Sequence, residues 1–322
     1  MELKRLSAKH KNNKLLYYLK NYCQLLVPNA YYRSRLKRKL NSISDEERTA
    51  LRERLNYYNK LKTTKALPSS SKMLSKISIN EDSKTYFFDF REYHRYFDQS
   101  LKAEYALGDV THIPNDPTFV KSRPIEGNNE NSILLKWDKV RHFTFIKKDN
   151  KKFANKKNKL VFRGKVHPTQ PHRVRFMELY YNHAMCNIGK VNTNHLPDKW
   201  TVSRMTIDQQ LNYKFILSLE GNDVASNLKW VMSSNSVAVM PKPKFETWFM
   251  EGQLIPDYHY IEIKADYSNL EERLKHFIKH PEEAIAINRN AKRYVALFQN
   301  KENEKLLSLL VLEKYFKCTD QL

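Results

Sequence analysis

The feature that most constrains the fold is a segment of about thirty residues, Lys214 to Pro243, with the sequence KFILSLEGNDVASNLKWVMSSNSVAVMPKP. It predicts a strand over Phe215 to Leu219, a turn that opens at Gly221, a helix from Leu228 to Met232 and a strand from Ser236 to Met240. Units of this kind build doubly wound α/β domains, in which a helix start faces a phosphate. The segment therefore predicts an α/β fold with either a nucleotide site or a purely structural unit at this turn.

The turn that opens at Gly221 has features of an anion-binding site, although it contains no standard phosphate-binding motif. Asp223 and Ser226 are candidate N-caps for the helix that follows. A helix start carries roughly half a positive charge and unpaired N–H groups, which suit a diphosphate. The turn contains neither GxGxxG nor a Walker loop, and this argues against a classical dinucleotide enzyme and against an NTPase.

The next elements extend the α/β pattern. Glu246, in the run PKPKFETWFMEG, lies about 25 residues beyond the glycine of the turn, where α/β nucleotide sites place an acid on the ribose hydroxyls. A strand is predicted over Tyr258 to Lys264. Ser268 with Glu271 makes a capping box for a helix, and a further helix starts at Pro281. This order of parts resembles the donor half of a GT-B glycosyltransferase.

Several motifs narrow that resemblance to one family. They are FRGK (Phe162 to Lys165), LEGNDVASNLKWV (Leu219 to Val231), PKPKFETWF from Pro241 and HYIEIKADYSNLEE from His259. As an ensemble they resemble glycosyltransferase family 90, and most closely its bacterial lipopolysaccharide-type members, over the stretch from Gly108 to Val295. The eukaryotic protein O-glucosyltransferases and the fungal capsule proteins are more distant relatives of that group.

The resemblance implies an inverting glycosyltransferase that moves a sugar from a UDP-sugar, of the glucose or xylose type, to a hydroxyl of a bacterial lipopolysaccharide or related surface glycan. Such chemistry needs a base for the acceptor hydroxyl and positive charge on the departing diphosphate. The sequence contains no DxD motif, and its histidines have no ligand-like spacing. We therefore expect no metal and no other cofactor, with lysines, arginines, hydroxyls and a helix N-terminus in the metal's place.

For the catalytic base we predict Asp109, which resembles the aspartate that precedes a VKSRP-like strand in the family. In the eukaryotic enzymes that aspartate lies further upstream of the strand, so His112 and Asp116 stay open as alternatives. A structural role for Asp109, as a turn cap after glycine, is the other alternative. Lys121 and Arg123, together with His112, are candidates for binding the donor sugar or the acceptor, against the alternative of a solvated loop.

For the donor, the resemblance implies contacts from two segments and two further residues: Arg163, Gly164, Lys165, Gly221, Val224, Ala225, Ser226, Lys229 and, on the ribose, Glu246. The eukaryotic relatives carry FRGSR, with an arginine where this chain has Val166, and their arginine at the helix start aligns with Asn227. The phosphate contacts are therefore expected to have moved to Lys165, Arg173 or Lys229. The alternatives are a solvent-facing Lys229 and a merely solvated Arg163.

The net charge of +22 attracts polyanions. Residues 3 to 39 contain many Lys and Arg residues and no Asp or Glu, and a second basic cluster spans Lys147 to Lys159. One interpretation is contact with an anionic acceptor or with the cytoplasmic leaflet, at roughly 1 kcal/mol per basic residue. The other is a low-GC genome that places Lys and Asn wherever the surface tolerates them.

The charge also raises an alternative function, a basic polyanion- or nucleic-acid-binding protein without catalysis. The sequence has no helix-turn-helix, RRM or zinc-finger signature, so nucleic acid is not an expected partner. A third interpretation is an inactive scaffold that kept the fold. The expected partners are a UDP-sugar, a glycan or lipid-linked glycan acceptor and an anionic membrane surface.

We expect a GT-B-like α/β fold with two Rossmann-like halves facing a cleft. Residues 1–155 are predicted to form a basic helical N-terminal region and the acceptor-side half, residues 156–298 the donor half, and residues 299–322 a helix that packs back on the acceptor half. There is no run of eighteen apolar residues and no apolar signal-peptide region at the start, and the three cysteines are scattered. These features predict a cytoplasmic protein, peripheral at the inner face of the bacterial inner membrane.

Within the first 155 residues the expected elements follow local signals. An amphipathic helix is predicted over residues 4–26, and Ser44 with Glu47 makes a capping box for a helix to Leu61. The tract Thr63 to Lys72 is the best linker candidate. TYFFDF, from Thr85, is predicted to be a strand, and REYHRYFDQSLKAEYAL after it a helix.

Overall fold

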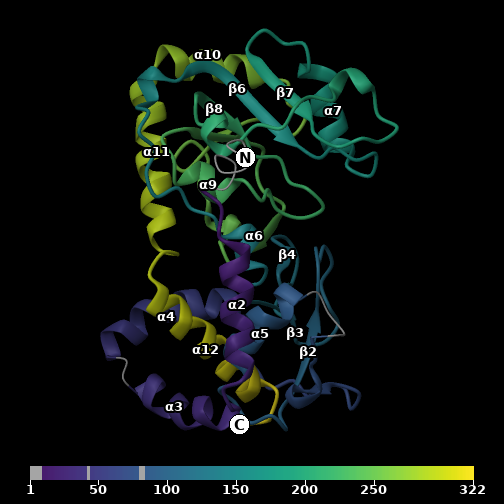
Figure 1. Ribbon diagram of the computed structural model, residues 1–322, viewed down its shortest axis with the longest axis vertical. Coiled ribbons are helices and arrows are strands. Elements are labelled where there is room, and N and C mark those ends of the chain that lie inside the picture. The colour runs from purple at the N-terminus through teal and green to yellow at the C-terminus, as the bar shows by residue number, and fades with distance from the viewer. Residues whose placement is uncertain (1–8, 42–43, 80–83) are drawn as a thin grey trace. The chain divides into compact units, whose positions relative to one another are not determined.

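The computed structural model describes residues 9–41, 44–79 and 84–322, and the chain divides into two compact units (Figure 1). The first unit comprises Arg141–Pro243 and Gln253–Leu297 with the described part of Met1–Asn12. The second comprises Asn13–Val140, Lys244–Gly252 and Phe298–Leu322. Each unit has its own parallel strands and its own helices, so the protein is a mixed α/β protein.

The first unit is built on a five-stranded sheet with the order β11-β9-β8-β6-β7, in which every neighbouring pair is parallel. Its strands are β6 (Lys157–Gly164), β7 (Cys186–Lys190), β8 (Tyr213–Leu217), β9 (Val237–Met240) and β11 (Ile261–Glu262). β8 and β9 are buried along their whole length, as expected for parallel strands covered on both faces. The chain starts at β6, adds β7 on one side and then β8 on the other, so the sheet reverses its direction of growth between β6 and β8.

The helices of the first unit supply the other half of its core. They are α7 (Pro171–Tyr180), α8 (Ile207–Gln210), α9 (Leu228–Met232), α10 (Leu270–Lys279) and α11 (Pro281–Ala296), with 3-10 turns at Phe153–Asn155 and Asp198–Trp200. α10 buries Leu270, Leu274 and Phe277, which share one face because they recur at helical spacing. These side chains pack in one apolar cluster with residues of the sheet such as Phe215.

The second unit contains a four-stranded sheet with the order β1-β2-β3-β5. β2 (Lys102–Ala106), β3 (Thr118–Val120) and β5 (Ser132–Leu134) are parallel, and β1 (Lys72–Met73) joins β2 antiparallel. A separate antiparallel pair is formed by β4 (Ser122–Pro124) and β10 (Phe245–Thr247), which lie far apart in the chain. The segment that contains Glu246 therefore belongs to the second unit, whereas the sequence analysis assigned it to the donor half.

The helices of the second unit are α2 (Lys14–Leu25), α3 (Asn29–Asn41), α4 (Asp45–Tyr58), α5 (Lys84–His94) and α12 (Lys301–Cys318), with 3-10 turns at Leu74–Lys76 and Glu251–Gln253 and the short α6 (Lys139–His142) at the passage to the first unit. The C-terminal helix α12 packs on α3, α4 and α5. Its Glu304 carboxylate accepts hydrogen bonds from Arg54 (2.7 Å), Lys136 (2.6 Å) and the Trp248 indole (2.8 Å). In the described part of the chain, no helix is both long enough and apolar enough to span a bilayer.

The prediction of a strand at TYFFDF is wrong, because Thr85 to Phe90 lie in α5 and all six are buried. A short apolar run that is buried on all sides has no period that separates a strand from a helix. The helix predicted to follow is also wrong at its end, where Lys102–Ala106 form β2. The predicted helix over residues 4–26 appears as α2, and its residues 4–8 lie outside the described chain.

Capping predictions had mixed outcomes. The capping box of Ser44 and Glu47 is confirmed, with both hydrogen bonds present. The box of Ser268 and Glu271 is wrong, because Asn269 is the N-cap of α10 and Ser268 donates instead to Asp266. Asp223 and Ser226 do not cap α9 either.

Other local predictions shifted in position. The N-cap of α9 is Asn227, whose side-chain amide donates to the Leu217 carbonyl at 2.9 Å. The strand predicted over Tyr258 to Lys264 is present only as β11. The tract Thr63 to Lys72 lies within the second unit, as a loop that leads into β1 at Lys72, so it does not link two domains.

Candidate functional site

In the first unit, two of the predicted donor segments lie at the carboxyl ends of β6 and β8. Gly164 ends β6 and Lys165 follows it, and the turn Gly221 to Ser226 follows β8. β6 and β8 are neighbouring parallel strands, so both segments lie at the same edge of the sheet. The sheet reverses its growth between these two strands, and open α/β sheets bind their ligands in the crevice outside such a switch point.

Arg173 of α7 holds these two loops together. Its Nε donates to the Glu220 carbonyl at 2.7 Å, its Nη2 to the Leu219 carbonyl at 2.8 Å and its Nη1 to the Lys165 carbonyl at 2.6 Å. Burial lowers the pKa of the Arg173 guanidinium to about 10. The side chain that the sequence analysis named as a substitute phosphate contact is therefore the bridge between the β6 and β8 loops.

Two further side chains at the start of α7 reach the same turn and were missed by the sequence analysis. Gln170 donates from its amide to Asn222 at 3.1 Å, and the Nε2 atom of His172 lies 2.8 Å from the Glu220 carbonyl. Pro171 could have pointed to them, because proline favours the first position of a helix. It marks the start of α7 after β6 and its loop, and Gln170 and His172 are its neighbours in the chain.

Gly164 is required by a close approach at the end of β6. A Cβ atom at this position would come within 2.5 Å of the Phe162 ring, closer than such atoms pack in proteins. Phe162 is buried in the core of the first unit, so its ring has little room to move away. The FRG sequence therefore lets the strand end close to its own aromatic ring and leave the sheet at Lys165.

Arg163 lies on β6 with its guanidinium directed away from the carboxyl edge. Arg163 pairs in register with Gly189, yet its Nη2 donates to the Asn187 side chain at 2.7 Å, two residues back along β7. Its other donors bond the carbonyls of Phe162, Asn187 and Ser203. Burial lowers the pKa of Arg163. The structure does not bring this guanidinium together with the turn Gly221 to Ser226.

The turn and its helix differ from the expected form in two ways. α9 has only five residues, so its macrodipole is small and the turn itself must supply N–H donors. Lys229 is fully buried, with its ammonium 5.4 Å from the centroid of the Phe143 ring, so the solvent-facing alternative is wrong. Val224 and Ala225 are also buried, and Ser226 is exposed.

In the second unit, Asp109 and Lys121 meet at the carboxyl edge of the parallel strands β2 and β3. The Lys121 ammonium forms an ion pair with the Asp109 carboxylate. The Lys121 side chain is 3% exposed and the Asp109 side chain 37% exposed. A buried cation thus positions a carboxylate that solvent can reach, which is an arrangement suited to a general base.

The loop that carries Asp109 is shaped by its neighbours. Gly108 adopts a φ of 89°, a conformation that glycine reaches without strain. The Ser122 hydroxyl accepts from the Val110 N–H and donates to the Val110 carbonyl, both at 3.1 Å. His112 lies exposed further along the loop, and Asp116 is half-buried before β3.

Arg123 and Glu246 form a buried pair across β4 and β10. They are register partners, and Arg123 Nε donates to the Glu246 carboxylate at 2.7 Å. Its other nitrogens bond the carbonyls of Tyr57, Tyr58 and Ser132, while the Tyr57 hydroxyl donates to the second Glu246 oxygen. Side chains occupied in this way hold β4 on β10, and neither enters the donor or acceptor contacts proposed below.

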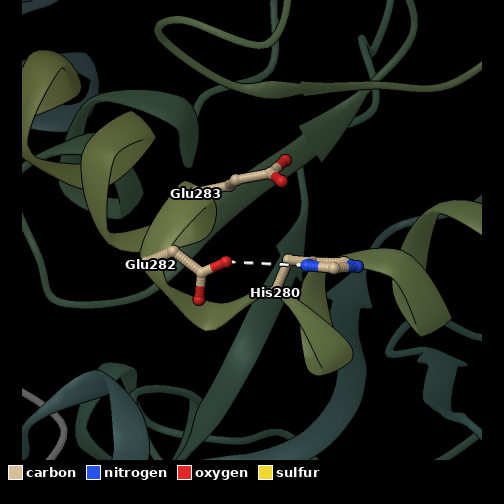
Figure 2. A group of neighbouring side chains, drawn as sticks. All are labelled: His280, Glu282 and Glu283. Carbon is tan, nitrogen blue, oxygen red and sulfur yellow. Dashed lines mark ion pairs between the residues drawn. The ribbon is translucent and has the colours of Figure 1, made fainter.

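One group in the described chain has the residue types of a metal site. His280, Glu282 and Glu283 at the start of α11 place their ligand atoms within 4.8 Å of one another (Figure 2). His280 pairs with Glu282 at 3.5 Å, and His276 bonds Glu283 at 2.8 Å and lowers its pKa. Acids in the first turn of a helix that pair with nearby histidines account for this group, and we assign no metal to it.

A surface pocket of about 630 Å³ lies elsewhere in the first unit. It is lined by the outer side of α7 and by the segment around Trp200. None of the predicted donor residues lines it, so we place the candidate site at the switch point and not here.

Comparison with known proteins decides the family. The chain matches the family model described as Glycosyl transferase family 90 over residues 127–318. It is also 40% identical over 311 residues to "O-glucosyltransferase LpsA" of Dichelobacter nodosus, a match that covers 96% of each chain. The chain belongs to glycosyltransferase family 90. The resemblance carried by FRGK and LEGNDVASNLKWV is thus confirmed, and the protein is a glycosyltransferase.

A second relative of this family-90 enzyme shares only part of it. "Uncharacterized protein 179R" of Invertebrate iridescent virus 6 is 27% identical over 109 residues, which is 32% of this chain and 9% of the viral protein. The residues around β6 and β8 lie inside the span of the family model, whereas Asp109, His112, Lys121 and Arg123 precede it.

Proposed function

We propose that this family-90 glycosyltransferase is an inverting, metal-independent enzyme of the GT-B type. It transfers a sugar from a UDP-sugar, of the glucose or xylose type, to a hydroxyl of a bacterial lipopolysaccharide or related surface glycan. The name of the relative from Dichelobacter nodosus, an O-glucosyltransferase, supports a glucosyl donor. The observation that carries the proposal is the meeting of the β6 and β8 loops at the switch point of a parallel sheet.

In this proposal the donor diphosphate binds at the β6 and β8 loops. The backbone N–H groups of the turn Gly221 to Ser226, the Ser226 hydroxyl and the Lys165 ammonium supply the positive charge and the hydrogen-bond donors. A guanidinium has five N–H donors, and the carbonyl bonds of Arg173 use one on each of its nitrogens. Arg173 therefore keeps donors for a phosphate oxygen while it holds both loops.

Asp109 acts as the base in the second unit. The acceptor oxygen attacks the anomeric carbon from the face opposite the diphosphate, and the bond to the UDP oxygen breaks with its electron pair leaving on UDP. The proton of the acceptor hydroxyl passes to Asp109, which Lys121 orients through their ion pair. Because the attack is a single displacement, the configuration at the anomeric carbon inverts.

The cellular setting in this proposal is the cytoplasmic face of the inner membrane. A UDP-sugar is a cytoplasmic donor, and an acceptor with a lipid anchor is held at the membrane surface. The net charge of +22 supports contact with an anionic surface.

The first test is a panel of UDP-, GDP-, ADP- and CMP-sugars, with binding and hydrolysis measured in the presence of EDTA. We expect saturable binding of a UDP-sugar that survives EDTA. Asp109→Asn should lower turnover by about 10²- to 10⁴-fold and leave donor affinity unchanged. Asp116→Asn, a carboxylate on the same loop, is the matched control and should keep its activity.

The same panel contradicts the proposal in two ways. Binding of no nucleotide sugar would remove the donor site, and binding that EDTA abolishes would remove the metal-free mechanism. Full turnover in Asp109→Asn together with loss in Asp116→Asn would move the base to the other carboxylate.

A further inference from the structure

Helix α2 presents its apolar side chains to solvent. The exposed fractions are 78% for Leu15, 62% for Leu16, 58% for Leu19, 42% for Tyr22 and 85% for Leu26, which follows the last turn. These positions recur at helical spacing and so share one face of the helix. We call these five residues the α2 stripe. Single exposed leucines are common on protein surfaces, but a contiguous apolar face of this kind marks an interaction site.

The opposite face of α2 fixes the helix with its stripe outward. The Tyr17 hydroxyl donates to Asp89 of α5 at 2.7 Å, and Asn21 is buried. The rings of Tyr17 and Tyr18 pack edge-on against Phe88, also of α5, next to which α2 lies in Figure 1. Tyr22 of the stripe also packs edge-on against Phe88, with ring centroids 5.0 Å apart. The helix is thus held by aromatic and polar residues, while Leu15, Leu16, Leu19 and Leu26 stay exposed.

The C-terminal end of α2 is anchored as well. Arg95, which is 1% exposed, donates from Nη2 to the carbonyls of Gln24 (2.8 Å) and Val27 (2.9 Å). Carbonyls at the end of a helix lack partners within the helix, so a buried cation there fixes the last turn. The α2 stripe is therefore part of a rigidly placed element of the second unit.

The charge around the stripe identifies its partner. Lys14 and Lys20 lie on α2, and the next helix α3 carries Arg33, Arg35, Lys37, Arg38 and Lys39. Residues 9–41 contain no Asp or Glu. An apolar face of leucine and tyrosine, in a segment whose charged residues are all basic, is the composition of a helix that lies in the interface of an anionic bilayer. The acid that meets this segment at Arg33, Asp98, pairs with it at 3.3 Å and is contributed by a distant part of the chain. A protein partner would need a surface that is both acidic and apolar, and no feature of this chain points to such a partner.

We propose that α2 docks the enzyme on an anionic lipid bilayer, with the α2 stripe in the headgroup and upper acyl region and the basic residues of α2 and α3 on the phosphates. A helix of this length covers about 18 Å of membrane surface. The proposal names the surface behind the peripheral location proposed above, and it holds whichever sugar donor the enzyme uses.

Cys23 provides a probe inside this surface. It is exposed and lies on the face of the α2 stripe, one residue after Tyr22, whereas Cys186 is buried and burial raises the pKa of its thiol to about 12. In a Cys318→Ser background, a thiol-reactive fluorophore therefore labels Cys23 selectively. We expect its emission to shift to the blue with vesicles that contain about 30 mol% phosphatidylglycerol and to stay unchanged with pure phosphatidylcholine.

A pair of matched variants tests the stripe directly in the full-length protein. Leu15→Glu with Leu19→Glu should weaken cosedimentation with the anionic vesicles by about tenfold or more, because two apolar side chains are lost from the interface and two like charges are added. Ile255→Glu with Ile285→Glu changes two side chains of the first unit that are 54% and 40% exposed and should leave vesicle binding unchanged. Circular dichroism and thermal unfolding confirm that both variants fold.

Two outcomes overturn the proposal. Equal vesicle binding by the α2 variant and the wild type would show that the stripe does not touch lipid. A wild-type dimer that the α2 variant converts to monomers, with no change in vesicle binding, would assign the face to a second copy. Hydrolysis of the UDP-sugar in solution is measured in parallel: its absence in the wild type counts against the proposed function, while the vesicle result stands on its own.

Discussion

At the scale of single residues, three carboxylates of this enzyme are held by cations that the fold has largely buried. Lys121 holds Asp109, Arg123 holds Glu246, and Lys136 with a second cation holds Glu304. Only Asp109 among these three carboxylates is substantially exposed. A buried ion pair contributes little net stability, yet it fixes geometry, and here the pair of Lys121 with Asp109 leaves a carboxylate accessible to solvent.

The three carbonyl bonds of Arg173 lead to a prediction about the donor site. Arg173→Lys should weaken UDP binding by about tenfold and lower the melting temperature, because a single ammonium cannot reach the carbonyls of both loops as the guanidinium fork does. Arg175→Lys is the control, since its guanidinium lies on the same helix and its side chain is 61% exposed. Calorimetric titration with UDP measures the effect, and equal affinity in the two variants would contradict it.

Asp89 predicts a pH dependence of stability. Burial raises the pKa of this carboxyl from 3.8 to about 6, against the opposing influence of Lys139. The folded state therefore binds the proton more tightly than the unfolded state, so this contribution to stability is complete below pH 4 and is lost as the pH rises through 6. The loss is on the order of 3 kcal/mol.

The measurement for Asp89 is urea unfolding of the wild type and of Asp89→Asn between pH 4 and 7. We expect the free energy of unfolding of the wild type to fall relative to that of the variant across this range. Asn keeps an acceptor for the Tyr17 hydroxyl and does not titrate, so the difference in slope isolates this group. Parallel curves would rule out the assigned pKa.

At the scale of elements, the segments that follow the strands at the candidate site are shaped by residues close to them in the sequence. β6 ends where Gly164 passes its own Phe162 ring, and the loop after β2 turns where Gly108 takes a positive φ. α7 begins at Pro171 and directs Arg173 onto the loop that follows β8. Local rules of this kind explain why the sequence analysis found both loops.

The end of β6 carries a stability prediction. Gly164→Ala should lower the free energy of unfolding by about 1 to 3 kcal/mol, because the new Cβ meets the Phe162 ring and overpacks a closed core. Adding Phe162→Leu should recover part of the loss, and the coupling in a double-mutant cycle measures the contact. Additive effects of the two changes would show that the ring is not what excludes a side chain.

At the scale of the whole molecule, the chain leaves the second unit and returns to it twice. Lys244–Gly252 comes back to place β10 on β4, and Phe298–Leu322 comes back as α12. Glu304 of α12 connects the returning segments with the rest of the second unit. Its carboxylate accepts hydrogen bonds from Arg54 of α4, from Lys136 and from the Trp248 indole. The second unit is therefore complete only when segments from both ends of the chain are in place.

Glu304→Gln should destabilise the second unit by about 3 to 5 kcal/mol, because Arg54 and Lys136 stay buried without their counter-charge. Scanning calorimetry should show one transition moving to lower temperature while the transition of the first unit keeps its position. Glu313→Gln, on the same helix and in an exposed pair with Lys317, should change stability by less than about 1 kcal/mol. A uniform shift of both transitions would contradict a local role.

Much of the first unit was predictable, and the reason is that its signals are local. The strands β8 and β9, the turn between them and the helices α10 and α11 follow from apolar runs and from glycine and proline positions. The prediction for TYFFDF failed because burial on every side of α5 left no period to read. The roles of Arg123 and Glu246 also did not follow from their neighbours in the chain, since their partners lie 123 residues apart.

By itself the sequence determined the family, the α/β class, the charge and the two loops of the candidate site, because motifs and apolar periods are properties of short segments. Only the tertiary structure decided which strands are neighbours and so where the switch point lies. It also decided which side of α2 stays outside, and that Lys229 is buried. These features depend on which distant segments exclude water from one another, and a local pattern does not contain that information.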